Sequence, residues 1–156
     1  MYNSPQDLID ALRSTPDTLA GLLAGLTQEQ AQTARGGDEG WSVVEVLCHL
    51  RDAEEIGLER DILMRDHENP DIIPWDQEKL ALERNYAAQD VYLVLAEFTT
   101  LRRQRLAFLA DLSSEGWKRA GKHRELGTID IFTHVLHMVS HDAIHCAQIA
   151  RQILDE

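Results

Sequence analysis

Apolar side chains recur every three or four residues along most of the chain, the spacing that gathers them on one face of an α-helix. The first such stripe joins five leucines, Leu8, Leu12, Leu19, Leu23 and Leu26. Because its register continues past Pro16, we expect one kinked helix or two short helices on one line. Strand signals are nearly absent, so the pattern favours a helical protein.

Capping residues indicate where the longer helices begin. Ser42 and Glu45 form an S-x-x-E capping box, which predicts a second helix that ends near His67. Asp90 is expected to cap a third long helix, and Thr128 a fourth that runs almost to the C-terminus. The expected core residues of the third helix are Leu93, Leu101, Phe108 and Leu112.

Four long amphipathic helices in a chain of 156 residues predict an all-α fold, a four-helix bundle. A chain of this length has the size of one ordinary domain, so we expect residues 1–156 to form a single bundle domain.

Composition narrows the classes of partner. The net charge of −12 argues against sequence-independent binding to nucleic acid, but not against a small molecule. No apolar run approaches the roughly 20 residues that cross a bilayer, and the first residues lack the features of a secretory signal. Cys48 and Cys146 make no disulfide framework. We therefore expect a soluble, cytoplasmic protein that binds no membrane.

Four of the seven histidines, His134, His137, His141 and His145, are three, four and four residues apart. On a helix they form one stripe, and an i, i+4 pair such as His141 and His145 can share one metal ion. One straight helix cannot also supply His137 to that ion, because the helix rises roughly 12 Å between His137 and His145. The third ligand must come from another element, and His49 is the best candidate.

Two segments resemble the DinB/YfiT-like superfamily of metal-dependent enzymes. They run from Trp41 to Glu54, W-S-V-V-E-V-L-C-H-L-R-D-A-E, and from Leu126 to Ile149, which includes H-D-A-I-H. The likeness covers nearly the whole chain. A tryptophan-led capping box, then H-L-x-D-x-E, then H-D-x-x-H is a fairly specific combination.

The resemblance implies an up-down-down-up four-helix bundle and one divalent transition metal, commonly nickel or zinc. It places the metal on three histidines, which correspond to His49, His141 and His145. Characterised relatives include S-transferases and isomerases that use a low-molecular-weight thiol as co-substrate. Members of the family are often dimers, so we also expect a homodimer.

Other residues have two open interpretations each. Asp52, three residues after His49, either orients an imidazole or lies on a solvated helix face. His137 either lines a pocket or packs. Trp117 is expected mainly to pack, with a role in covering a ligand as the alternative. His134 is expected at the helix surface or in an interface.

Three neutral histidines leave a metal at least one open coordination position, as in catalytic sites. We expect the metal to activate a small nucleophile, with a thiol in group transfer preferred because of the resemblance. The alternatives are hydrolysis by metal-activated water, and a non-catalytic metal- or ligand-binding stress-response module. In each case the partner is a small molecule.

Overall fold

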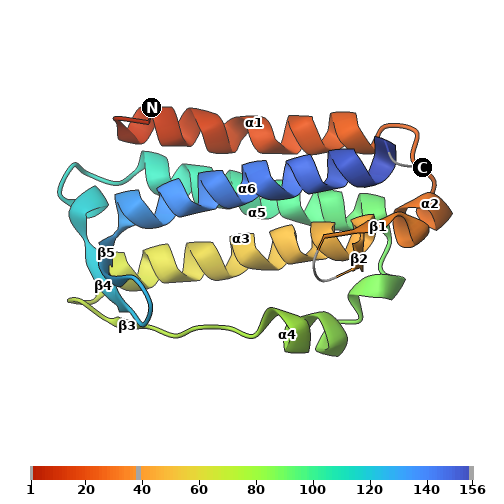
Figure 1. Ribbon diagram of the computed structural model, residues 1–156. Coiled ribbons are helices and arrows are strands. Elements are labelled where there is room, and N and C mark those ends of the chain that lie inside the picture. The colour runs from red at the N-terminus through yellow and green to blue at the C-terminus, as the bar shows by residue number, and fades with distance from the viewer. Residues whose placement is uncertain (1, 38–39, 155–156) are drawn as a thin grey trace.

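The computed structural model describes residues 2–37 and 40–154 and is built on four long helices. They are α1 (Pro5–Leu23), α3 (Val43–Asp66), α5 (Val91–Ala110) and α6 (Ile131–Leu154). Helices α1 and α6 run in one direction and α3 and α5 in the other (Figure 1). Each helix packs on two neighbours, in the cyclic order α1, α5, α3, α6. The bundle is therefore up-down-down-up, as predicted.

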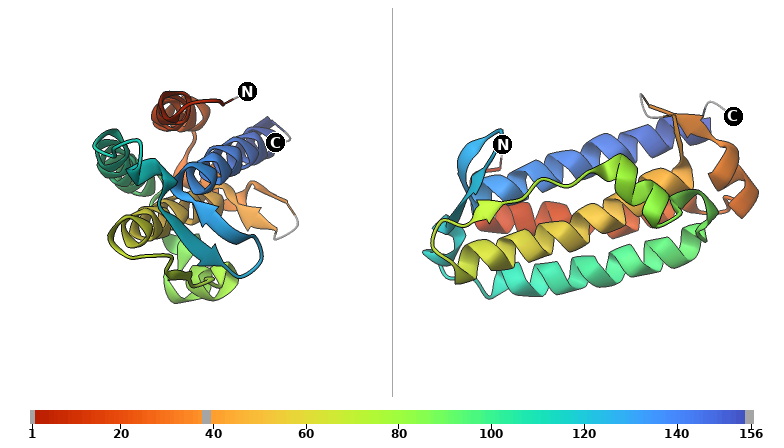
Figure 2. Two further views of the ribbon diagram at one scale, coloured as in Figure 1. Left: turned by 90° about the vertical axis from the view of Figure 1, so that its left-hand side faces the viewer. Right: turned by 90° about the horizontal axis from the view of Figure 1, so that it is seen from below.

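The parallel pair α3 and α5 requires a connection that returns along the whole bundle. This connection contains strand β3 (Asp71–Ile72), helix α4 (Gln77–Glu83) and the 3-10 helix η1 (Tyr86–Ala88), and it runs lengthwise past the bundle (Figure 2). Shorter elements join the other helices. Helix α2 (Gln28–Thr33) and strands β1 (Arg35–Gly36) and β2 (Trp41–Ser42) lie between α1 and α3. The 3-10 helix η2 (Gly116–Lys118) and strands β4 (Ala120–His123) and β5 (Gly127–Asp130) lie between α5 and α6.

Two small sheets correct the expectation that strands are nearly absent. Strand β4 pairs antiparallel with β5 and parallel with β3, so the three strands cover the end of the bundle where α3 ends and α6 begins (Figure 2). Strands β1 and β2 pair antiparallel at the opposite end. Strands of two to four residues are too short to produce a recognisable alternating pattern.

The helix boundaries follow the caps, with one correction. Ser42 accepts from the amide of Glu45 and begins α3 as predicted. At α6 the capping side chain is Asp130, which accepts from the amide of Thr133 at 2.8 Å, whereas Thr128 lies inside β5. Helix α1 is a single helix with Pro16 inside it. No helix in the described ranges has the length and apolar character that a bilayer crossing requires.

The prediction for the core face of α5 was wrong in part, although Phe108, and Leu112 just after the helix, pack partly buried against the core. Leu93 is 60% exposed. The buried residues of α5 are Val91, Val94, Phe98, Arg102, Arg105 and Leu109. Two arginines thus occupy core positions, where a hydrophobic pattern cannot reveal them.

These arginines form an ionic layer in the middle of the bundle. Arg102 donates to both carboxylate oxygens of Glu54 at 2.8 and 2.9 Å. Arg105 donates to Asp61 at 2.8 Å and to Glu54 at 3.2 Å. All four side chains are fully buried, so their charges must be matched within the layer.

Arg102 also pairs with Asp142 of α6 at 2.8 Å, and Thr15 of α1 donates to the same carboxylate. The layer therefore links all four long helices.

Candidate metal centre

Three histidines meet between α3 and α6, near the end of the bundle that carries β1 and β2. They are His49, His141 and His145, and one ring nitrogen from each lies within 4.8 Å of the others. The Nε2 atoms of His49 and His141 are 2.8 Å apart. His141 and His145 share one face of α6 because they are one turn apart, and His49 faces them because α3 packs against α6.

Two tryptophans hold the ring of His49. Trp75 stacks on it with ring centroids 5.5 Å apart and planes inclined by 17°. Trp41 lies at 5.2 Å in a tilted arrangement. The His49 side chain is only 3% exposed, so its orientation is fixed by packing.

Burial keeps the imidazoles of His49 and His141 uncharged. Desolvation, followed by the neighbouring histidines, lowers the pKa of His49 to about 3. The same two effects lower the pKa of His141 to about 4. Two neutral Nε2 atoms at 2.8 Å need either one shared proton or one cation between them. Neutral nitrogen donors aimed at a common point are the donor set of zinc and related divalent metals, so the three residues fit such an ion.

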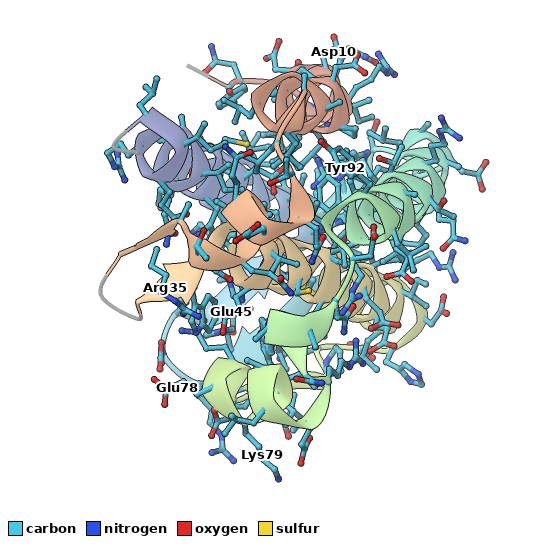
Figure 3. The ribbon with its side chains drawn as sticks, turned by 90° about the vertical axis from the view of Figure 1, so that its right-hand side faces the viewer. Asp10, Arg35, Glu45, Glu78, Lys79 and Tyr92 are labelled. Carbon is cyan, nitrogen blue, oxygen red and sulfur yellow. The ribbon has the colours of Figure 1, made fainter. Side chains whose placement is uncertain are left out.

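Gln148 fixes the third imidazole. Its Oε1 lies 2.8 Å from Nδ1 of His145 and can only accept, so Nδ1 carries the proton and Nε2 keeps its lone pair. The amide nitrogen of Gln148 donates to the carbonyl of Gly36 at 3.4 Å. The neighbouring Arg35 donates to Glu45 at 3.2 Å, which ties β1 to the beginning of α3 (Figure 3).

Sequence reasoning did not assign a role to Gln148. The available signal was its position three residues after His145 on the same helix.

A cavity of about 200 Å³ lies beside the histidine group, and His141 forms part of its wall. Helix α3 contributes residues between Ala53 and Arg60, and α6 contributes residues between His134 and His141. Trp75 and the β4–β5 hairpin complete the wall. His137 lines the cavity from an exposed position.

His134 is not at the helix surface, which corrects that expectation. Its side chain is buried, and its Nδ1 lies 2.6 Å from Asp61. Desolvation lowers the pKa of His134 against the opposing effect of the Asp61 carboxylate. The neutral ring donates from Nδ1 and lines the cavity, so Nε2 is the acceptor left for a ligand.

Asp52 fits neither interpretation given to it. Its carboxylate is fully buried and accepts from Arg51 at 2.9 Å, from Arg84 at 2.8 Å and from the hydroxyl of Tyr86. None of its hydrogen bonds within the described residues reaches a histidine. Asp52 therefore joins α3 to the connection before α5, away from the three imidazoles.

Trp117 packs at the far end of the bundle. It is 6% exposed, belongs to the core cluster near the end of α3, and contacts Phe132 with ring centroids 6.4 Å apart. It does not line the cavity beside the histidines, so its alternative role in covering a ligand there is not supported. Trp75 occupies that position instead, and no sequence pattern distinguished the two tryptophans.

Comparison with known proteins adds relatives of similar length. A family model for the DinB superfamily matches residues 11–149. A protein of Oceanobacillus iheyensis named "Putative metal-dependent hydrolase OB0782" is 30% identical over 142 residues, which are 90% of this chain and 81% of that protein. A Bacillus cereus (strain 03BB102) protein, also named "Putative metal-dependent hydrolase", is 29% identical over 143 residues, 90% of this chain and 80% of the relative.

One solved structure has a similar fold. YfiT from Bacillus subtilis, described as "a probable metal-dependent hydrolase with an unusual four-helix bundle topology", superimposes with a TM-score of 0.81 and 25% sequence identity. The match covers 96% of this chain and 87% of that one.

Proposed function

The chain belongs to the DinB superfamily, and from this premise we propose that it is a metal-dependent hydrolase of a small molecule. In this proposal His49, His141 and His145 bind one divalent transition metal. The observation that carries it is the convergence of three ring nitrogens within 4.8 Å beside a cavity. The names of the relatives, which describe metal-dependent hydrolases, support the same reaction class.

The residues around the group favour a catalytic over a closed structural site. Three protein ligands leave a coordination position open, whereas structural zinc sites use four. A divalent metal bound there would supply Lewis-acid chemistry, by activating water and polarising a carbonyl group. The low pKa values of His49 and His141 keep both rings neutral and able to ligate at neutral pH. Gln148 holds His145 in the tautomer that ligates through Nε2.

We propose nickel or zinc as the metal, because both form divalent ions that bind imidazole nitrogen.

Analysis of metal content tests the site directly. In protein produced without a histidine tag, we expect close to one metal ion per chain. Replacement of any one of the three histidines by Ala should remove most of it. His67→Ala is the matched control, since His67 is exposed at the end of α3. Full metal content in His141→Ala would contradict the proposed ligands.

We propose hydrolysis, rather than transfer of a thiol, as the reaction. Thiol chemistry draws no support from the names of the relatives. A co-substrate thiol therefore stays a prediction from the family resemblance alone.

One assay compares the two reactions. Zinc- or nickel-loaded protein is given activated esters and amides, and in parallel a panel of low-molecular-weight thiols with electrophilic acceptors. We expect ester or amide hydrolysis that depends on the metal and is lost in His145→Ala. Metal-dependent conjugation of a thiol without hydrolysis would favour thiol transfer over hydrolysis. Metal binding with neither reaction would favour a non-catalytic binding module.

The homodimer also stays a prediction. Light scattering at micromolar concentration would test it, and a mass of one chain, 17.7 kDa, would contradict it.

A further inference from the structure

The cavity beside the histidine group has a charge pattern opposite to that of the whole chain. The chain carries 27 acidic and 15 basic residues. Of the described residues that line the cavity, none is Asp or Glu, and Arg60 is the one Lys or Arg. An acidic protein that keeps carboxylates out of one cavity has a site suited to an anion.

Arg60 has no anionic partner within the described part of the chain. Its Nη2 donates to the carbonyl of Ile73 at 2.7 Å, and among the described residues no carboxylate forms an ion pair with its guanidinium. Partial burial lowers the pKa of Arg60 below its usual range, against the opposing effect of the nearby Asp61 carboxylate, yet the guanidinium stays charged at neutral pH. The adjacent carboxylate of Asp61 is committed to Arg105 and His134. A half-buried guanidinium that lacks an ion pair is stabilised by any anion that reaches it.

Arg60 and the histidine group lie at opposite ends of the cavity. Asp61 bonds His134, so residues 60 and 61 of α3 are level with His134 of α6. His141 lies seven positions after His134, a rise of about 10 Å along the helix. Between these ends Ile56 of α3 and Met138 of α6 give the wall an apolar part, and His137 lies beside Met138.

We infer that this cavity binds a small, elongated carboxylate, with its carboxylate on Arg60, its apolar middle between α3 and α6, and its other end at the three histidines. That this other end is hydrolysed rests on the proposed function. A carboxylate suits a single guanidinium, because the planar fork can donate to both of its oxygens. A phosphate dianion would need further cationic donors, which the described lining residues do not provide. The volume of about 200 Å³ restricts the ligand to a small molecule.

Binding can be measured without any reaction. We would titrate the full chain by calorimetry with phenylalkanoates of two to six methylene groups, and with the primary amide of each acid. Metal-free protein is measured first, because a bound metal would itself attract carboxylates. The same titrations with zinc-loaded protein follow. We expect at least one acid to bind roughly tenfold more tightly than its amide, the usual size of one charge-assisted hydrogen-bonded contact.

Variants assign the preference to Arg60. Arg60→Gln should make the acid and the amide bind equally, whereas Arg103→Gln, at an exposed position of α5, should leave the tenfold difference intact. Arg60→Lys keeps the charge and should retain a smaller preference for the acid, which guards against a folding defect in Arg60→Gln. Equal binding of all acids and amides by the metal-free wild type, including no binding of either, would overturn the inference. An acid preference that survives in folded Arg60→Gln would also overturn it.

The hydrolase proposal and the carboxylate-binding inference can be rejected independently of each other. An Arg60-dependent preference for acids, in a zinc-loaded protein that hydrolyses no ester or amide group placed at the far end of such an acid, would leave the inference standing and reject the hydrolase. Hydrolysis of neutral esters with no Arg60-dependent binding of acids would support the hydrolase and reject the carboxylate-binding inference.

Discussion

Gln148 accepts a hydrogen bond from Nδ1 of His145 at 2.8 Å, three residues farther along α6. The bond determines which ring nitrogen is free, since an amide oxygen cannot donate. Partners of this kind raise the basicity of an imidazole and hold its ring in place. Gln148 is itself fixed by the carbonyl of Gly36, so the orientation of His145 depends on strand β1.

We therefore expect Gln148→Leu to weaken metal binding by roughly 10–100-fold, the usual cost of losing such a partner. Affinity would be measured by competition with a chromophoric chelator. Gln152→Leu is the matched control, because Gln152 is buried one turn farther along α6 and donates to the carbonyl of Trp41 at 2.6 Å. It should lower the free energy of unfolding while metal affinity stays unchanged. Equal affinity of the Gln148 variant and the wild type would show that His145 needs no such partner.

The metal-free protein should lose stability as the pH falls from 7 to 5. His49 and His141 have folded-state pKa values of about 3 and about 4, below the value of about 6.5 in an unfolded chain. Below pH 6.5 the unfolded state therefore binds more protons, and protonation favours unfolding. Each histidine contributes a loss of up to about 1.4 kcal/mol per pH unit, until the pH reaches its folded-state pKa.

Urea unfolding at pH 7, 6 and 5 would measure this loss. The double variant His49→Gln, His141→Gln should show a clearly shallower decline over the same range. The buried carboxylate of Glu54 adds little in this window, because its pKa is lowered from 4.5 and its effect begins at lower pH. A decline of the same slope in the double variant would assign the pH dependence to other groups.

Local rules were enough to predict the four long helices of this bundle, whereas their up-down-down-up order was implied by the family resemblance. The capping box at Ser42 and Glu45 and the helical spacing of the leucines in α1 are short-range signals, and the structure contains both features. Helix α5 shows where such rules fail. Arg102 and Arg105 look like surface residues until Glu54 and Asp61, more than 40 residues away, provide buried partners.

The candidate site also contains residues that the sequence predicted and residues that it did not. The i, i+4 spacing of His141 and His145 placed two imidazoles on one face. The limited reach of one helix indicated His49 as the third, the family resemblance implied the same residue, and the structure brings it next to the other two. Trp75 could not be chosen from sequence, because it lies in an irregular connection whose path depends on the packing of α3 and α5. Asp52 shows that proximity to a histidine in sequence does not determine where a carboxylate points.

Glu54 should be among the residues whose side-chain charge is most costly to lose. It is fully buried and accepts from both Arg102 and Arg105. Glu54→Gln would leave two buried guanidinium groups undercompensated, with an expected loss of about 3–5 kcal/mol in the free energy of unfolding. Glu55→Gln, one residue along, removes only a partly exposed pair with Arg84 and should cost about 0–1 kcal/mol. Similar urea midpoints for the two variants would contradict a structural role for the ionic layer.

Replacement by Ala should change the free energy of unfolding in opposite directions at Gly57 and Gly21. A Cβ atom on Gly57 would lie 2.6 Å from Nη1 of Arg105, and Arg105 cannot move freely because it is bonded to Asp61. Gly57→Ala should therefore cost about 1–3 kcal/mol, the range for overpacked sites. At Gly21 in α1 the added methyl group meets no atom of another described element within 4 Å, so Gly21→Ala should stabilise by about 0.5–1 kcal/mol through helix propensity. Urea unfolding of the two variants would compare them under one condition. A Gly57→Ala protein as stable as the wild type would mean that α3 and α5 can separate without loss, and that the close approach of Arg105 to α3 is not required.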